Sequence, residues 1–164
     1  MQNTKIISDI PKVARKEISF ALYNYKNLSA LIENRKNTLR ERLNYSTSAW
    51  LKGRNQDSNS LEDILTMYEE DEYIKRIKKW KIIINKLLNE FINEEYPVEY
   101  YLVKYKYIDN MSDNFLIEKL NLDSKEELQH LIMEIKEKIY NYALKENLYK
   151  EVIGDGKMSN YCYC

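Results

Sequence analysis

A short segment near the C-terminal third combines side chains that can contact DNA bases with side chains that would repel phosphate. Gln129 can form two hydrogen bonds with an adenine, and Lys125 and His130 can reach a base edge or a phosphate. Two glutamates stand between Lys125 and Gln129, and their charge would oppose a phosphate backbone. Lys136 lies about two turns further along the same expected helix. The spacing leaves two interpretations open: a helix that enters a DNA groove, or a helix that only closes a protein core.

The two glutamates have a local function that does not involve a ligand. Ser124 and Glu127 form an S-x-x-E pattern, which is typical of a helix N-terminus whose backbone N–H groups are capped by both side chains. Acidic side chains in the first turn, Glu126 among them, also complement the helix dipole. The pattern predicts a helix that begins near Lys125 and runs towards Leu148.

Two further helices are expected directly before this one. Pro97 suits the first position of a helix, and Ser112 is a suitable cap for a helix over residues 113–120. The turns "DNMSD" and "NLDS" separate the three helices. Their expected core residues are Val98, Tyr101, Leu102, Tyr105 and Ile108, then Leu116, Ile117 and Leu120, and finally Leu128, Leu131, Ile132, Ile135, Ile139 and Tyr142.

Upstream, two long helices are expected to form an antiparallel hairpin. One runs over residues 11–43, a polar loop follows over 44–60, and Ser60 begins the second helix. The acidic run at 69–72 shifts the phase of the second helix. The expected buried residues are Ile18, Leu22, Tyr25, Leu28, Ile32, Leu39 and Leu43 on the first helix, and Leu61, Leu65, Tyr68, Ile74, Ile77, Trp80, Ile84, Leu87 and Phe91 on the second.

Composition favours an all-α protein. Only 3 glycines and 2 prolines occur in 164 residues, whereas sandwiches and barrels need frequent turns made by these residues. We therefore expect a helical hairpin over residues 1–93, a three-helix headpiece over 94–150 and a flexible tail over 151–164.

Charge is balanced over the whole chain, with 26 basic and 26 acidic residues, but it is unevenly distributed. Basic residues dominate residues 1–55 and acidic residues dominate 56–99. A solvated helix face is the simplest interpretation of such runs. If the first long helix lies along a duplex, its basic residues would make auxiliary phosphate contacts; these are Arg35, Lys36, Arg40 and Arg42.

The stretch "YPVEYYLVKYKYIDNMSDNFLIEKLNLDSKEELQHLI" resembles the C-terminal promoter-binding helix-turn-helix of sigma factors. Together with the upstream helices, the layout over roughly residues 20–148 is similar to the ArpU/RinA-type phage late-gene regulators. This resemblance implies a sigma-like three-helix headpiece that binds double-stranded DNA and activates late genes. In such a headpiece, our candidate DNA-facing residues are Lys125, Gln129, His130 and Lys136.

Three departures from the sigma-like pattern support an alternative. Ile117 stands where the family has a small alanine, the "NLDS" link is one residue longer, and the recognition helix begins with acidic residues. A protein that keeps this fold without binding bases would instead act as a protein-interaction module, for RNA polymerase or a host-defence protein.

Catalytic and metal-binding patterns are lacking, so we expect neither an enzyme nor a cofactor. "GDGK" lacks the upstream glycine and the final Ser or Thr of a phosphate-binding loop, and His130 is the only histidine. The start of the chain lacks the apolar core of a signal peptide, and no run is long enough to span a membrane, which predicts a cytoplasmic protein. A second copy of the chain could cover apolar flanks that include Tyr25, Tyr68 and Tyr73, which predicts a homodimer.

Overall fold

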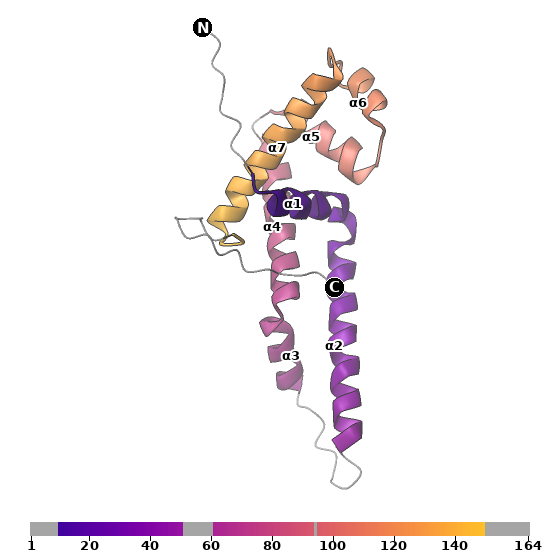
Figure 1. The fold of residues 1–164 in the computed structure, drawn as a ribbon, viewed down its shortest axis with the longest axis vertical. Helices are drawn as coiled ribbons and strands as arrows, with labels where there is room; N and C mark the ends of the chain where they lie inside the picture. The colour runs from indigo at the N-terminus through magenta and orange to yellow at the C-terminus, as the bar shows by residue number, and fades with distance from the viewer. Residues whose placement is uncertain (1–9, 51–60, 94, 150–164) are drawn as a thin grey trace.

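The computed structural model describes residues 10–50, 61–93 and 95–149, with side chains described in these ranges except at residues 44–50. All regular structure in these ranges is helical, which confirms the all-α class. In Figure 1, α2 and the pair α3–α4 are long neighbouring rods, and the other helices gather at one end. The elements are α1 (Lys12–Tyr23), the 3-10 turn η1 (Tyr25–Asn27), α2 (Leu28–Trp50), α3 (Leu61–Glu70), α4 (Glu72–Asn93), α5 (Pro97–Val103), the π-helical turn η2 (Lys104–Ile108), α6 (Asp113–Lys119) and α7 (Lys125–Lys145).

The first long helix is broken at Asn24, so the prediction of one helix over 11–43 was wrong. The backbone N–H and the side-chain amide of Asn24 both donate to the carbonyl oxygen of Phe20, at 3.0 and 2.8 Å. Asparagine competes in this way for backbone acceptors and therefore favours helix ends over helix interiors. After the break, α1 lies crosswise to α2 instead of extending it (Figure 1).

The loop predicted over residues 44–60 was wrong for its first part, because α2 continues through Trp50. Serine, threonine and asparagine are only weakly unfavourable in helices, and a long helix that is already formed extends at little cost. Residues 51–60, with the expected cap Ser60, lie outside the described residues. The same is true of the predicted tail over 151–164.

The second long helix is interrupted by the single residue Asp71, where the acidic run shifts its phase. One carboxylate oxygen of Asp71, Oδ1, accepts from the backbone N–H of Ile74 at 2.9 Å and so caps the start of α4. The other oxygen, Oδ2, accepts from Nε and Nη2 of Arg35 on α2, at 3.1 and 2.8 Å. This one carboxylate therefore begins a helix and also joins the two arms of the hairpin.

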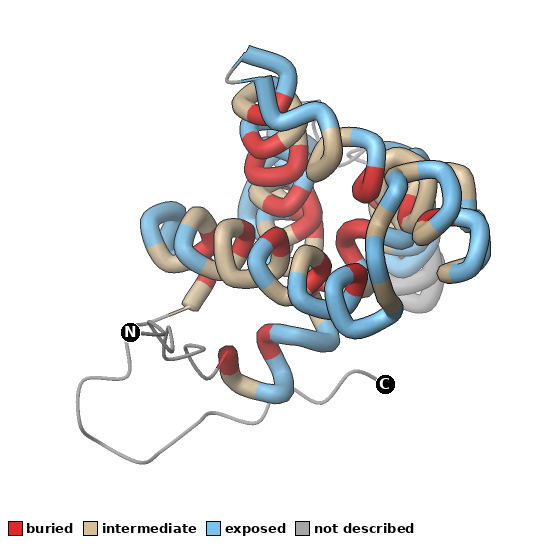
Figure 2. Tube along the Cα trace, turned by 90° about the horizontal axis from the view of Figure 1, so that it is seen from above, coloured by how far each residue is buried: buried red, intermediate tan, exposed pale blue. Residues whose placement is uncertain are grey.

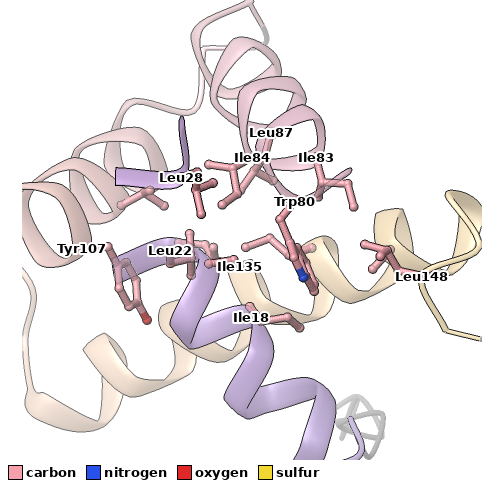
Figure 3. Packing of buried hydrophobic residues seen from close by; sticks show 14 of the residues in the cluster. Ile18, Leu22, Leu28, Trp80, Ile83, Ile84, Leu87, Tyr107, Ile135 and Leu148 are labelled. Atoms are coloured by element: carbon pink, nitrogen blue, oxygen red, sulfur yellow. The ribbon is translucent and has the colours of Figure 1, made fainter. Parts of the chain in front are cut away.

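Buried side chains from all parts of the described chain form one continuous core. Figure 3 shows Trp80 of α4 between Ile18 of α1, Ile135 of α7 and Leu148. In the view of Figure 2, the buried positions of these helices turn towards one another. The core therefore crosses the boundary that was expected at residue 93. Predicted core residues that are confirmed as buried are Ile18, Leu22, Leu28, Ile32, Tyr68, Ile74, Ile77, Trp80, Ile84, Leu87, Phe91, Leu102, Leu116, Leu128, Ile132, Ile135 and Ile139.

Three predicted core positions are exposed. Leu61 and Leu65 of α3 are 74% and 51% exposed, because α3 lies beyond the helices that cover α4. Tyr101 is 41% exposed, whereas Tyr107, which was not predicted, is 2% exposed. The wider π-helical turn at Lys104–Ile108 shifts the helical phase at Tyr107 and so accounts for its burial, whereas Tyr101 lies before this turn, in α5.

A polar cluster fixes the end of the described chain to the core. The Glu17 carboxylate on α1 accepts from Nη2 of Arg76 on α4 and from the hydroxyl of Tyr149. Nη1 of Arg76 also donates to the carbonyl oxygen of Leu148, at 3.3 Å. Burial raises the pKa of the Tyr149 hydroxyl, and the neighbouring Glu17 raises it further. The cluster thus links α1, α4 and the segment that follows α7.

Ile84→Ala should lower the free energy of unfolding by about 2–5 kcal/mol, because it leaves a cavity at a position that is 0% exposed. Ile82→Ala is the matched control on the same helix, at 58% exposure, and should cost less than about 0.5 kcal/mol. Chemical denaturation followed by circular dichroism measures both. Equal losses in the two variants would contradict the assigned face of α4.

Asp71→Asn should destabilise the protein by about 1–2 kcal/mol near neutral pH, since asparagine still caps a helix but cannot pair with the Arg35 guanidinium. Burial raises the pKa of the Asp71 carboxyl, but hydrogen bonds from Arg35 and from the Ile74 N–H outweigh burial and hold that pKa below its ordinary value. The stabilisation is therefore present above about pH 4 and is lost as the pH falls through the folded-state pKa.

The difference in unfolding free energy between wild type and Asp71→Asn should shrink as the pH is lowered below about 4. Glu72→Gln is the control, because the Glu72 side chain is 85% exposed in its ion pair with Lys75. A difference for Asp71→Asn that is constant with pH would argue against the charge pair.

Candidate nucleic-acid interface

The turn between α6 and α7 is defined by backbone geometry. Asn121 has a φ of 53°, in the left-handed region, where asparagine is tolerated better than most residues. The N–H of Leu122 donates to the carbonyl of Ile117 at 2.9 Å, and the N–H of Asn121 donates to that of Glu118 at 3.3 Å. This pair of hydrogen bonds is the Schellman arrangement that ends many helices. The link between the two helices is therefore a specific turn.

Serine caps start both helices, as predicted. The Ser112 hydroxyl accepts from the N–H of Phe115 at 3.3 Å, and the Ser124 hydroxyl accepts from the N–H of Glu127 at 3.1 Å. The Glu127 carboxylate turns back and accepts from the N–H of Asp123 at 2.6 Å, one residue before the position that the S-x-x-E pattern predicts. The Glu127 side chain is thus engaged in starting α7.

Leu116 of α6 and Leu128 of α7 are both 0% exposed and belong to the core that joins the two helices. Ile117, the residue that departs from the sigma-like pattern, is half-buried and packs against the same core. Because α6 and α7 are in contact with Ile117 present, this departure is compatible with packing of α6 against α7.

Three of the four DNA-facing candidates on α7 lie on open surface. Lys125 and Gln129 are exposed, and His130 is exposed with its Nδ1 3.7 Å from the Glu134 carboxylate. Glu126 is exposed as well. The start of α7 therefore presents a mixed surface, in which groups that are able to contact bases lie among carboxylates.

Lys136 is half-buried beside basic residues of two other elements. Burial lowers the pKa of Lys136, and the charges of Lys106 on η2 and Arg15 on α1 lower it further. Lys106 pairs with the Asp113 carboxylate at 2.6 Å, and Nε of Arg15 donates to the carbonyl of Ile10 at 2.8 Å. This basic cluster could not be predicted from the sequence, because its members lie far apart in the chain and the packing of α1 on α7 and η2 brings them together.

The four candidates on α2 lie apart from α7. Arg35 is paired with Asp71, and Lys36 pairs with Glu33 at 2.7 Å and lies 5.7 Å from the centre of the Tyr68 ring. Arg40 and Arg42 are exposed just past the middle of α2, whose C-terminal end points away from α6 and the start of α7 (Figure 1). The structure does not bring these residues together with Lys125 and Gln129.

Comparison of the chain with family models, with curated proteins and with solved structures finds no match. Within the described residues, no helix has the length and apolar character needed to cross a membrane.

Lys136→Met should raise the free energy of unfolding at about pH 7 by more than about 0.5 kcal/mol, the limit of ordinary surface effects. Burial and two like charges disfavour the charged lysine in the folded state, so its removal relieves an unfavourable term. Folding lowers the pKa of Lys136, so the wild-type side chain loses its positive charge as the pH rises towards about 10. The gain in unfolding free energy from Lys136→Met should therefore shrink at that pH. Chemical denaturation at both pH values tests this, with exposed Lys125→Met as control. A destabilised Lys136→Met would contradict the interpretation.

Proposed function

We propose that this protein is a DNA-binding transcriptional regulator of the phage or prophage type, with α6, the turn and α7 acting as a helix-turn-helix. In this proposal the N-terminal half of α7 enters the major groove of double-stranded DNA. Lys125 and His130 contact the backbone or base edges, and Gln129 contacts a base.

The observation that carries the proposal is the exposed start of a helix held in a fixed orientation. Leu128 anchors the first turns of α7 to Leu116, while Lys125, Gln129 and His130 on the other sides of α7 are uncovered. A groove-binding helix needs both properties, because base contacts require a defined position as well as access.

The acidic start of α7 is compatible with this role, since one of the two carboxylates in its first turn has a structural partner within the chain. Glu127 caps the helix start, and Glu134 lies beside His130. Glu126 is exposed and in the first turn, where it would lie near phosphate. One substitution at Glu126 can therefore measure the repulsion that opposes binding.

Arg35, Lys36, Arg40 and Arg42 are not part of the interface that we propose. Arg35 joins the arms of the hairpin, and Arg40 and Arg42 lie one to two turns beyond it on α2, whose C-terminal end points away from α6 (Figure 1). Among the basic residues near Lys136, the exposed Arg15 on α1 is the better source of an auxiliary phosphate contact, because Lys106 pairs with Asp113 and Lys136 is half-buried.

A second candidate function, binding of another protein such as RNA polymerase or a host-defence factor, is favoured by exposed aromatic rings on α5 and α6. The rings of Tyr101 and Tyr105 stack with centroids 5.6 Å apart, and Phe115 meets Tyr105 edge-on at 5.9 Å. Tyr101 and Phe115 are 41% and 37% exposed, with Met111 nearby in the chain at 42%. Aromatic residues and methionine are enriched at protein interfaces.

Glu126→Lys should strengthen binding to any duplex and steepen the dependence of log K on log salt by about 0.9 per added phosphate contact. Gln129→Ala should instead cost about 1–3 kcal/mol, and only on the preferred sequence, because it removes a base contact. Fluorescence anisotropy over a salt series, with a duplex selected from a random library and an unrelated duplex, measures both effects.

Glu127→Ala serves as the control. It should lower stability by about 1 kcal/mol, as the loss of a cap does, without changing base preference. If wild type binds no duplex at low salt and only Glu126→Lys does so, while Gln129→Ala has no effect, the DNA-binding proposal fails and the protein-interaction function takes its place.

A further inference from the structure

The far end of the hairpin, which we call the distal arm, consists of α2 from Arg35 to Leu43 together with α3 (Leu61–Glu70). Figure 1 shows it projecting beyond the body formed by α1, α4, α5 and α7. Two helices by themselves cannot enclose an apolar face, so part of that face stays in water. Leu61 and Leu65, one turn apart on α3, are 74% and 51% exposed for this reason.

The two helices of the distal arm carry opposite charge. In α3, Glu62, Asp63, Glu69 and Glu70 are acidic and no residue is basic. Successive residues of a helix are turned by about 100° around its axis. In α2, Arg40 and Arg42 therefore lie on opposite sides of the helix face that carries Leu39. Among the described side chains, neither Arg40 nor Arg42 forms an ion pair; the Arg35–Asp71 pair lies at the base of the arm.

We propose that the distal arm is a dimerisation surface, which packs against the distal arm of a second copy about a two-fold axis. Each α2 then lies beside the partner's α3, and the four helices form a bundle around Leu61 and Leu65 of both copies. A two-fold axis makes each contact occur twice, so the basic helix meets the acidic helix on both sides.

The charge pattern favours a second copy over other occupants of this surface. The carboxylates of α3 would repel nucleic acid and anionic lipid. Because one arm carries both the acidic and the basic helix, it is complementary to itself without any other protein. The tyrosines that the sequence suggested for this role offer less free surface than Leu61 and Leu65, since Tyr68 is 8% exposed and Tyr25 and Tyr73 are half-buried.

Sedimentation velocity of the full chain at tens of micromolar should show a dimer. The double variant Leu61→Ser/Leu65→Ser should raise the dimer dissociation constant by at least about tenfold, because it removes the exposed apolar contacts. Val13→Ser is the matched control, since Val13 on α1 is 51% exposed, as Leu65 is, and lies outside the arm. A wild type that is monomeric at these concentrations would overturn the proposal.

A charge exchange tests which helices meet. Arg40→Glu/Arg42→Glu in one chain, and Glu62→Lys/Glu69→Lys in another, should each weaken self-association by about tenfold or more, because like charges then face each other. An equimolar mixture of the two variants should form a heterodimer, since every α2–α3 contact is attractive again. If the mixture associates no better than the separate variants, α2 does not face the partner's α3 and the proposal is wrong. Thermal unfolding of each variant shows that the chain is folded, and none of these substitutions touches α6 or α7, so the outcome is independent of the DNA-binding test.

Discussion

Trp80 stands where α4 packs against both α1 and α7, and its side chain is 2% exposed. A side chain of this size has to be enclosed on several sides, and no single neighbouring helix can do that. The chain meets this requirement by turning at Asn24, so that α1 covers the face of α4 that α2 leaves open. The same requirement draws α7 across α4. Its end is then held by Glu17, Arg76 and Tyr149.

The location of α7 follows from that core. Its C-terminal half packs against α1 and α4, and its N-terminal turns extend beyond them with α6 alongside. Residues that take part in the core cannot also serve as contacts on the outer surface, which explains why Lys136 is half-buried although Gln129 is exposed. The C-terminal half of α7 thus fixes the position of its N-terminal half, which is the part that we propose to bind DNA. The side chains of α7 that lie outside the core are the ones available to a ligand.

The helical class, the starts of α5, α6 and α7, and most of the core could be predicted from sequence, because they depend on side chains close together in the chain. Pro97, Ser112 and Ser124 are local signals, and the apolar period of α4 is regular. The two breaks were harder to predict. Asn24 and Asp71 act through single hydrogen-bonding side chains within otherwise helical sequence, and the π-helical turn at Lys104–Ile108 changes the phase without any change in composition.

The candidate site was only partly predictable for a similar reason. Exposure of Lys125 and Gln129 follows from helical phase alone. The proximity of Arg15, Lys106 and Lys136, and the engagement of Arg35 by Asp71, depend on contacts between residues distant in sequence. Contacts between distant residues leave no recognisable pattern in the sequence of either helix. Charge counted along the chain therefore did not reveal that Arg35 is paired within the hairpin, nor that basic residues of α1 and η2 lie near Lys136 of α7.

Three turns that follow helical segments contain an asparagine in the left-handed backbone conformation, a position that glycine often occupies. These residues are Asn110, Asn121 and Asn147, with φ values between 53° and 55°. Glycine would adopt this geometry more easily, but it would also give the unfolded chain more conformations to lose on folding. With asparagine, less conformational entropy opposes each turn. For the link between α6 and α7, the consequence is a stiffer joint: Asn121 has fewer alternative backbone states than glycine would have, so the direction in which α7 leaves α6 varies less from molecule to molecule.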